Sequence, residues 1–310
     1  MTAQPSDRAS TEDNAPAGTL EHLLQILTLR AVPALGEDTF VGESQRQPWR
    51  RVYGGQVLAQ ALVAAQRTVD PDGTVRPVHS MHAYFLRAGD DSEPITFSVE
   101  RLRDGHSFSA RRVHALQHGR AILSMAASFQ DPADGLDHAE PMPVGVPGPE
   151  TLPALAERYA NLTGEGARHW LRERPMDLRH VTPPSYVEVA PDPQPHQQIW
   201  MRTQAPISGE ADTPAMHAAV LAYASDYSML EPILRRHGHT YAEPGIRMAS
   251  LDHAMWFHRP ARADAWLLND LTSPSAQGAR GLGLAHIYAT DGTLVASVAQ
   301  EGMIRLPATP

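Results

Sequence analysis

Residues 53–68 read YGGQVLAQALVAAQRT, and this stretch decides how the chain is organised. After the glycine pair, apolar residues recur at three- and four-residue spacing, which predicts a helix over 56–68 with one continuous apolar stripe. Strand-like segments then follow one another along the chain, at 76–86, 95–102, 107–116 and 121–130. One apolar helix followed by antiparallel strands predicts an α+β unit in which the helix packs against a curled sheet.

The same order of elements returns in the second half of the chain. A helical pattern covers 214–230, and strand patterns lie at 199–203, 247–257, 266–271, 280–289 and 293–305. The two halves also align in sequence. Phe85 corresponds to Phe257 at an offset of 172 (257 − 85), and Val57 in the first helix corresponds to Val220 in the second at an offset of 163 (220 − 57). A period this long indicates duplicated domains, with chance similarity between two α+β segments as the alternative.

Composition excludes several classes of protein. The chain has 310 residues, a formal net charge of −9 and no cysteine. Disulfides and a cysteine nucleophile are therefore excluded. An acidic chain without a Lys/Arg-rich run is a poor candidate for binding nucleic acid. No apolar run is long enough to span a bilayer, and residues 1–18 have no apolar signal-peptide core. We expect a soluble cytoplasmic protein with no nucleic-acid partner.

The distribution of proline and glycine divides the chain into segments. Residues 1–18 are polar and are expected to form a disordered tail. The first α+β domain is expected over 19–131. Residues 132–183, which begin with a Pro- and Gly-rich stretch, are expected to form a linker region. The second domain is expected over 184–310.

Comparison of the two halves singles out Asp226. Its neighbours three and four residues away on the predicted helix are largely apolar, so its carboxylate points toward a buried face. The matching residue in the first half is Val63 (226 − 163). A buried carboxylate needs a partner or a shifted pKa. A structural role, in which the carboxylate bonds a nearby hydroxyl, remains open.

Two further polar residues replace apolar ones in the second half. Gln300 ends an apolar row on its strand where the first half has Ala127 (300 − 173), and Ser250 stands where the first half has Val78 (250 − 172). Each is weak evidence alone. Together with Asp226 they supply an acid, a hydroxyl and an amide that are able to converge on one water molecule. The carboxylate would accept the proton of the water while the other two orient it for direct attack on an activated acyl group.

Several longer motifs occur in the same order as in a known family. They are YGGQ (53–56), VHSMHAYFLR (78–87), LRDG (102–105), YASD (223–226), LDHAMWFHRP (251–260) and VASVAQEG (295–302). With these motifs the chain, from about Leu20 to Arg305, resembles the acyl-CoA thioesterase II family. The resemblance implies a tandem (double) hotdog fold of class α+β, in which each half is a long helix packed on a curved antiparallel sheet. It also implies hydrolysis of fatty acyl-CoA to free fatty acid and CoA, without metal or cofactor, by a homo-oligomer (dimer or tetramer).

The resemblance also assigns site residues. The family's catalytic trio of Asp, Thr or Ser, and Gln falls on Asp226, Ser250 and Gln300, so serine stands here where some relatives carry threonine. His79 matches a family histidine, and either an auxiliary catalytic role or a structural hydrogen bond fits it. Candidates for binding the CoA phosphates are the arginines Arg87, Arg111, Arg112, Arg259 and Arg280.

Two other functions remain as alternatives. A hotdog hydratase acting on enoyl-CoA would need an Asp and a His placed together, and the helix carrying Asp226 offers no nearby histidine. A non-catalytic acyl-CoA-binding sensor is the second alternative, and the intact polar trio argues against it. The chain has neither the Gly-x-Ser-x-Gly motif of α/β-hydrolases nor a phosphate-binding Gly-rich loop with Lys.

Overall fold

The computed structural model describes residues 18–69, 76–162, 171, 174–186 and 188–307. The expected disordered tail, 1–18, lies outside the described residues except for Gly18. The helices are α1 (Leu20–Leu27), α2 (Gly54–Gln66), α3 (Leu155–Arg158), α5 (Pro214–Ser225) and α6 (Glu231–His237). The strands are β1 (Arg30–Ala31), β2 (Thr39–Gly42), β3 (Val78–Phe85), β4 (Ile95–Asp104), β5 (Phe108–Gln117), β6 (Arg120–Gln130), β7 (Met176–His180), β8 (His196–Thr203), β9 (Arg247–Ser250), β10 (Asp252–Phe257), β11 (Leu267–Gln277), β12 (Arg280–Ala289) and β13 (Leu294–Arg305).

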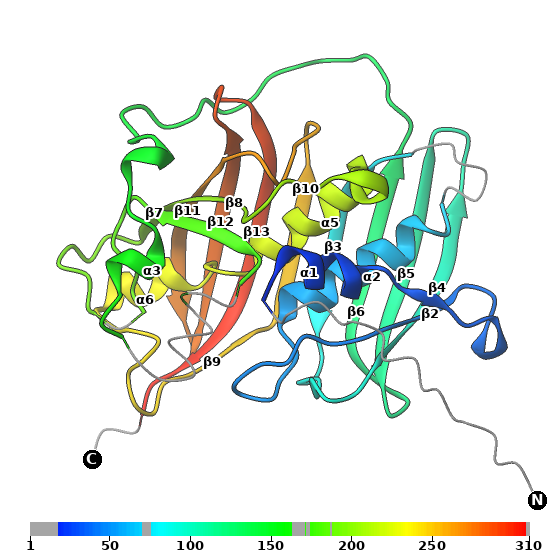
Figure 1. Cartoon of the computed structure of the whole chain (residues 1–310), viewed down its shortest axis with the longest axis horizontal. Helices are drawn as coiled ribbons and strands as arrows, with labels where there is room; N and C mark the ends of the chain where they lie inside the picture. Colours follow the sequence, from blue (N-terminus) through cyan, green and yellow to red (C-terminus); the bar gives the residue numbers. More distant parts are fainter. Residues whose placement is uncertain (1–17, 70–75, 163–170, 172–173, 187, 308–310) are drawn as a thin grey trace, which may run out of the picture.

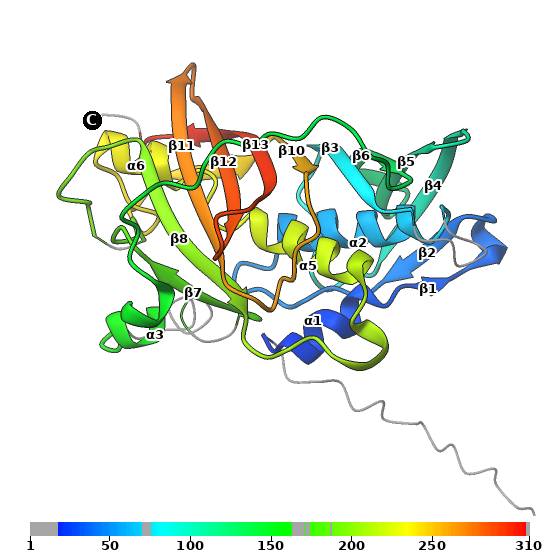
Figure 2. The same cartoon turned by 90° about the horizontal axis from the view of Figure 1, so that it is seen from above.

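These strands form one continuous antiparallel sheet that runs through both halves. Its order is β1-β2-β4-β5-β6-β3-β10-β13-β12-β11-β8-β7, with β9 paired to β13. The halves join at the centre, where β3 pairs with β10 and Met81 lies opposite Met255. The sheet curves around α2 and α5, which pack against each other inside the curve (Figures 1 and 2). Each half is therefore a helix on a curved antiparallel sheet, and the expected α+β class is confirmed.

The register of the strands reproduces the internal repeat. In the first half Ala83 of β3 pairs with Met125 of β6. In the second half Met255 of β10 pairs with Val298 of β13. The offsets are 172 (255 − 83) and 173 (298 − 125), the same values that the sequence comparison gives. The residues matched across the halves in sequence therefore occupy equivalent positions in the sheet.

The second long helix is shorter than the sequence pattern predicts. A helix over 214–230 is wrong, because α5 ends at Ser225 and a separate helix, α6, begins at Glu231. After Ser225 the backbone makes tighter turn bonds, from Tyr227 N–H to the carbonyl oxygen of Ala224 and from Glu231 N–H to that of Ser228, and Pro232 then stands in the first turn of α6, where its missing N–H leaves no helical bond unmade. Asp226 is consequently the residue that caps the C-terminus of α5. At a helix end its side chain is free to reach beyond the helix's own surface.

The region expected to be a linker contains regular structure. Strand β7 pairs with β8, with Leu178 opposite Met201, and it begins eight residues (184 − 176) before the expected start of the second domain. The strand is five residues long and holds only two apolar side chains, both buried. A pattern this short is hidden by the surrounding loop-rich composition.

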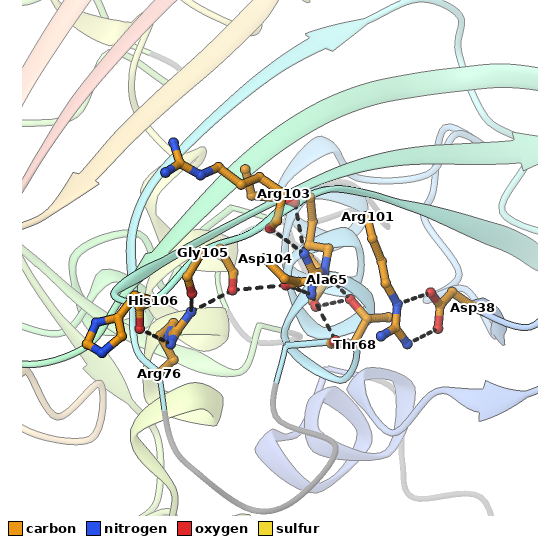
Figure 3. Close-up of polar contacts among 12 residues, drawn as sticks. Asp38, Ala65, Thr68, Arg76, Arg101, Arg103, Asp104, Gly105 and His106 are labelled. Atoms are coloured by element: carbon orange, nitrogen blue, oxygen red, sulfur yellow. Dashed lines mark hydrogen bonds and ion pairs between the residues drawn. The ribbon is translucent and has the colours of Figure 1, made fainter.

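A buried polar network fixes the C-terminal end of α2 to the β4–β5 hairpin. Arg111 is almost fully buried, and its guanidinium donates to Thr68 Oγ1 at 2.8 Å and to Asp104 Oδ1 at 2.6 Å. Thr68 donates in turn to the carbonyl oxygen of Ala65 (Figure 3). A charged side chain is stable at this depth only because its donors are paired. The opposite end of α2 is thereby held in place beside the second half.

Candidate active site

A cavity of about 1120 Å³ lies between the two halves. Its wall includes Tyr53 and Gly54 from the start of α2 in the first half. The second half contributes Asp226, Ser250 and Gln300. The three residues expected to act together are therefore brought together on the surface of one cavity, although they come from α5, β9 and β13.

Hydrogen bonds connect the three side chains. Gln300 Nε2 donates to Ser250 Oγ at 2.8 Å, and Ser250 Oγ lies 3.4 Å from Asp226 Oδ1. The pairing of β9 with β13, where Ser250 lies opposite Gly302, places the hydroxyl beside the amide. The arrangement leaves a carboxylate oriented by two neutral polar groups at a cavity wall.

The carboxyl group of Asp226 is more basic than an ordinary aspartate. Burial raises its pKa to about 6, because the charged form loses contact with water. Hydrogen bonds from Gln300, from the backbone N–H of Gly55 and from Ser250 act in the opposite direction. The group is thus ionised at neutral pH, and its pKa is close to the value that suits a general base working there.

The two glycines that begin α2 allow the halves to meet closely. A Cβ atom at Gly54 would lie 2.7 Å from Asp226 Oδ2 and 3.1 Å from the ring of Phe85. A Cβ atom at Gly55 would lie 2.3 Å from the carbonyl oxygen of Tyr223. Neither position therefore has room for a side chain, and the first turn of α2, with its free N–H groups, lies directly against the carboxylate.

Tyrosines from both halves form the adjoining wall. Tyr53 donates from its hydroxyl to the carbonyl oxygen of Tyr223 at 3.0 Å, and its ring stacks on Tyr227 with centroids 5.1 Å apart. Tyr223 donates to Gln45 Oε1 at 2.8 Å. Burial raises the pKa of Tyr227 to about 12, so its phenol stays protonated. These contacts link α2 to α5 next to the carboxylate.

Sequence reasoning missed His253, which lies behind the trio. It is fully buried on β10, with Nδ1 2.5 Å from Gln300 Oε1 and Nε2 3.0 Å from Ser225 Oγ. Burial lowers its pKa to about 4, so the imidazole is neutral. The signal was present in the repeat, because the matching residue in the first half is the apolar Met81 (253 − 172).

Comparison with known proteins identifies the family. Residues 177–303 match the family model described as Acyl-CoA thioesterase, and residues 45–130 match that of the Acyl-CoA thioesterase N-terminal domain. Acyl-coenzyme A thioesterase 8 of Mus musculus is 41% identical over 302 residues, which span 94% of this chain and 91% of that protein. The chain belongs to the acyl-CoA thioesterase family. Acyl-CoA thioesterase 2 of Haemophilus influenzae is 37% identical over 294 residues, covering 92% of this chain and 98% of that protein.

Solved structures agree with this assignment. The acyl-CoA thioesterase II TesB2 of Mycobacterium marinum superposes with a TM-score of 0.73 at 40% identity, covering 92% of this chain and 99% of that one. A hot dog fold protein of Alicyclobacillus acidocaldarius gives a TM-score of 0.73 at 15% identity, covering 92% and 98%. The tandem hotdog fold is therefore confirmed. The protein is an enzyme, an acyl-CoA thioesterase.

The structure does not bring His79 to the trio of this thioesterase. Its Nε2 lies 2.8 Å from Ser128 Oγ, and its ring meets that of Phe108 edge-on with centroids 5.8 Å apart. It is not among the residues that line the cavity. These contacts correspond to the structural hydrogen bond that the sequence left open for His79 beside an auxiliary catalytic role.

Of the arginines considered for the CoA phosphates, Arg87 alone lines the cavity, where its Nη1 donates to the carbonyl oxygen of Ala121 at 2.7 Å. Arg111 is buried in the network at the end of α2. The remaining ones pair with carboxylates elsewhere: Arg112 with Glu100, Arg259 with Asp137 and Arg280 with Glu301. Arg87 is thus the member of this set that is placed to meet a ligand in the cavity.

Across the part of the chain that the structure describes, His, Asp and Glu side chains do not gather in groups of three that are able to hold a metal ion. Among the described helices, none is long and apolar enough to cross a membrane.

Proposed function

We propose that this thioesterase hydrolyses fatty acyl-CoA thioesters by direct attack of a water molecule, which Asp226 deprotonates while Ser250 and Gln300 orient it. The observation that carries the proposal is the convergence of these three side chains, from separate elements, on the wall of one cavity. A thioester carbonyl is already activated toward nucleophiles, so a positioned base and an oriented water are sufficient chemistry. No covalent intermediate is needed.

The roles follow from the hydrogen-bonding capacity of each group. A carboxylate only accepts hydrogen bonds, so Asp226 is the proton acceptor. Ser250 accepts from the Gln300 amide and donates toward Asp226, which occupies its hydroxyl proton. Within the described contacts Ser250 has no imidazole partner of the kind that activates a serine nucleophile. These contacts favour water over serine as the attacking group.

The proposal places one hydrolytic site in each chain. At the positions of the trio the first half carries Val63, Val78 and Ala127, none of which is able to bind or deprotonate water. The first half instead supplies Gly54, Tyr53 of the tyrosine wall and much of the cavity lining. It acts as scaffold and as part of the substrate pocket.

The alternatives fit the site less well. A hydratase would need an acid–base pair that reaches the ligand, and His253 is separated from the cavity by Gln300, to which it is bonded. A binding protein has no need of a carboxylate with a raised pKa on the pocket wall, whereas a hydrolase does.

We also propose that the enzyme is a cytoplasmic homo-oligomer, a dimer or tetramer. Tyr84 on β3 is 64% exposed and Trp256 on the adjacent β10 is 39% exposed, which leaves large aromatic groups uncovered near the centre of the sheet. Exposed apolar groups gathered on one face favour association. Light scattering after size-exclusion chromatography tests this, and a monomer at micromolar concentration contradicts it.

The experiment that tests the catalytic proposal measures CoA thiol release from fatty acyl-CoA. Asp226→Asn, Ser250→Ala and Gln300→Ala are each expected to lower kcat, with the loss of the base costing about 10²–10⁴-fold. Asp270→Asn is the matched control, because Asp270 on β11 is hydrogen-bonded to His196 of β8 and does not line the cavity. If the Asp226→Asn variant releases CoA at the wild-type rate, Asp226 is not the catalytic base and the proposed site is wrong. A burst of CoA equal to the enzyme concentration refutes direct attack by water.

A further inference from the structure

We infer that His253 is a positioning residue that sets the amide orientation of Gln300 through its Nδ1–H, with Ser225 holding the imidazole from the other side. The inference rests on the proposed function, since it concerns how the trio is held. It adds to the site a line of three side chains behind the cavity wall: Ser225, His253 and Gln300. His253 does not line the cavity and acts only through Gln300.

The hydrogen bonds assign the proton on the imidazole. Ser250 has one hydroxyl proton and donates it to Asp226 Oδ1, so the group of Gln300 that lies 2.8 Å from Ser250 Oγ is the NH₂. The amide oxygen then faces His253 Nδ1 at 2.5 Å. Because that oxygen only accepts, Nδ1 must carry the hydrogen. A neutral imidazole has one N–H, so Nε2 is an acceptor; it lies 3.0 Å from the hydroxyl of Ser225, whose single proton it shares with the carbonyl oxygen of Ala222 at 2.9 Å.

Burial keeps this arrangement in one state. His253 has no exposed surface, and β10 lies between β3 and β13, so the imidazole has no room to turn toward water. Both ring nitrogens have partners within hydrogen-bond distance. A rotated amide would place its oxygen against Ser250 Oγ, whose proton is directed to Asp226, and its NH₂ against an N–H donor. Both contacts are repulsive, so one orientation is selected.

Comparison with the first half shows that the fold itself does not require these three polar side chains. The first-half counterparts of the line are Leu62 (225 − 163), Met81 (253 − 172) and Ala127 (300 − 173). Met81 and Ala127 are paired residues of β3 and β6, and both are buried. The same fold is thus built in the first half with apolar groups at all these positions. The polar line exists only in the half that has the carboxylate.

The test uses substitutions that replace one ring nitrogen at a time. The amide nitrogen of an asparagine side chain falls near the position of histidine Nδ1, whereas that of glutamine falls near Nε2. We expect His253→Asn to keep kcat within about threefold of wild type. His253→Gln and His253→Met are expected to lower kcat by about 10–100-fold with KM unchanged, because a misplaced catalytic group costs up to about this much. Thermal melting of each variant shows that it folds. Equal kcat for the Asn and Gln variants overturns the inference.

A second measurement does not depend on activity. Long-range ¹H–¹⁵N correlation spectra of ¹⁵N-histidine-labelled protein at neutral pH, with the signal assigned from the His253→Asn variant, report which nitrogen carries the proton. We expect the proton on Nδ1, and a proton on Nε2 overturns the inference. If Asp226→Asn remained fully active, the proposed function would fail while this tautomer measurement still decided the orientation of Gln300.

Discussion

Gly54 lies so close to the carboxylate of Asp226 that a Cβ atom would come within 2.7 Å of Oδ2, so the first turn of α2 meets the end of α5 across the boundary between the halves. The trio belongs entirely to the second half, but its carboxylate is held from the first. The duplicated helices have therefore diverged in complementary ways. Helix α2 begins with two glycines, so no side chain stands at its start. Helix α5 ends at Ser225, which leaves the side chain of Asp226 at the helix end.

This contact makes Gly54 a sensitive position. Gly54→Ala puts a Cβ atom 2.7 Å from Asp226 Oδ2, so the carboxylate has to shift from the position in which it accepts from Ser250. We expect kcat to fall at least about tenfold, since a shift near 1 Å in a catalytic group is costly. Helix propensity acts the other way, because alanine is favoured over glycine by about 1 kcal/mol within a helix. Steady-state kinetics together with a melting curve should show a folded and poorly active enzyme.

The control for this prediction is Gly148→Ala. Gly148 has an ordinary negative φ of −64°, and a Cβ atom there meets nothing within 4 Å. Its kcat should match the wild type. A Gly54→Ala enzyme with full activity would show that the close approach of α2 to the carboxylate does not matter.

The rate should depend on pH through Asp226. Its pKa is raised to about 6, and only the ionised form accepts a proton. We expect kcat to level off above about pH 7 and to fall about tenfold per pH unit well below 6. The imidazole of His253, with its pKa lowered to about 4, stays neutral and adds no ionisation to this range. A profile of CoA release from pH 4.5 to 8.5 checks this, and a flat profile between 5 and 7 contradicts it.

Local patterns predicted most of the strands and the α2 helix, because alternating or helical apolar spacing follows directly from which face is buried. That Asp226, Ser250 and Gln300 lie together on one cavity was predictable for a different reason. The chain contains its own reference, and a polar residue that replaces an apolar one at an equivalent buried place needs an explanation. His253 satisfies the same test against Met81, so applying the comparison to all buried positions would have found it.

Other features depend on tertiary contacts that no local pattern encodes. The contact of Gly54 appears only when the start of α2 lies against the end of α5, because Asp226, which it meets there, is 172 residues away in the sequence (226 − 54). The early end of α5 was hidden because the residues after it, 227–230, continue an apolar helical spacing. Strand β7 was hidden because its pairing with β8 stabilises a segment too short to be distinctive.

Arg87 and Arg112 should differ in how much each contributes to binding acyl-CoA. Arg87 lines the cavity, whereas Arg112 pairs with Glu100 outside it. If Arg87 meets the phosphates of CoA, Arg87→Gln should raise KM for acyl-CoA several-fold with little change in kcat, while Arg112→Gln leaves both unchanged. The KM increase should shrink at high salt, because screening weakens the contact in the wild type. An equal effect of the two substitutions on KM would remove Arg87 from the binding site.

Glu231 makes the stability of the fold depend on pH. It is fully buried at the start of α6, and its Oε1 accepts from the backbone N–H of Ser185 at 2.5 Å. Burial raises its pKa from 4.5 to about 7. The unfolded chain therefore ionises this group at a lower pH than the folded chain does. The stabilisation is complete below pH 4.5 and is lost as the pH rises through 7.

The size of this effect is about 3 kcal/mol, because the shift of about 2.5 pKa units (7 − 4.5) corresponds to about 1.4 kcal/mol per unit. Glu231→Gln keeps an oxygen for the Ser185 N–H but cannot ionise. Its unfolding free energy should consequently exceed that of the wild type at pH 8 and approach it at pH 5, as measured by urea denaturation. Glu243→Gln is the control, because Glu243 is a partly exposed partner of His239. Parallel stability curves for wild type and Glu231→Gln across this range would show that the buried carboxyl does not ionise, or that its charge is compensated in the folded protein.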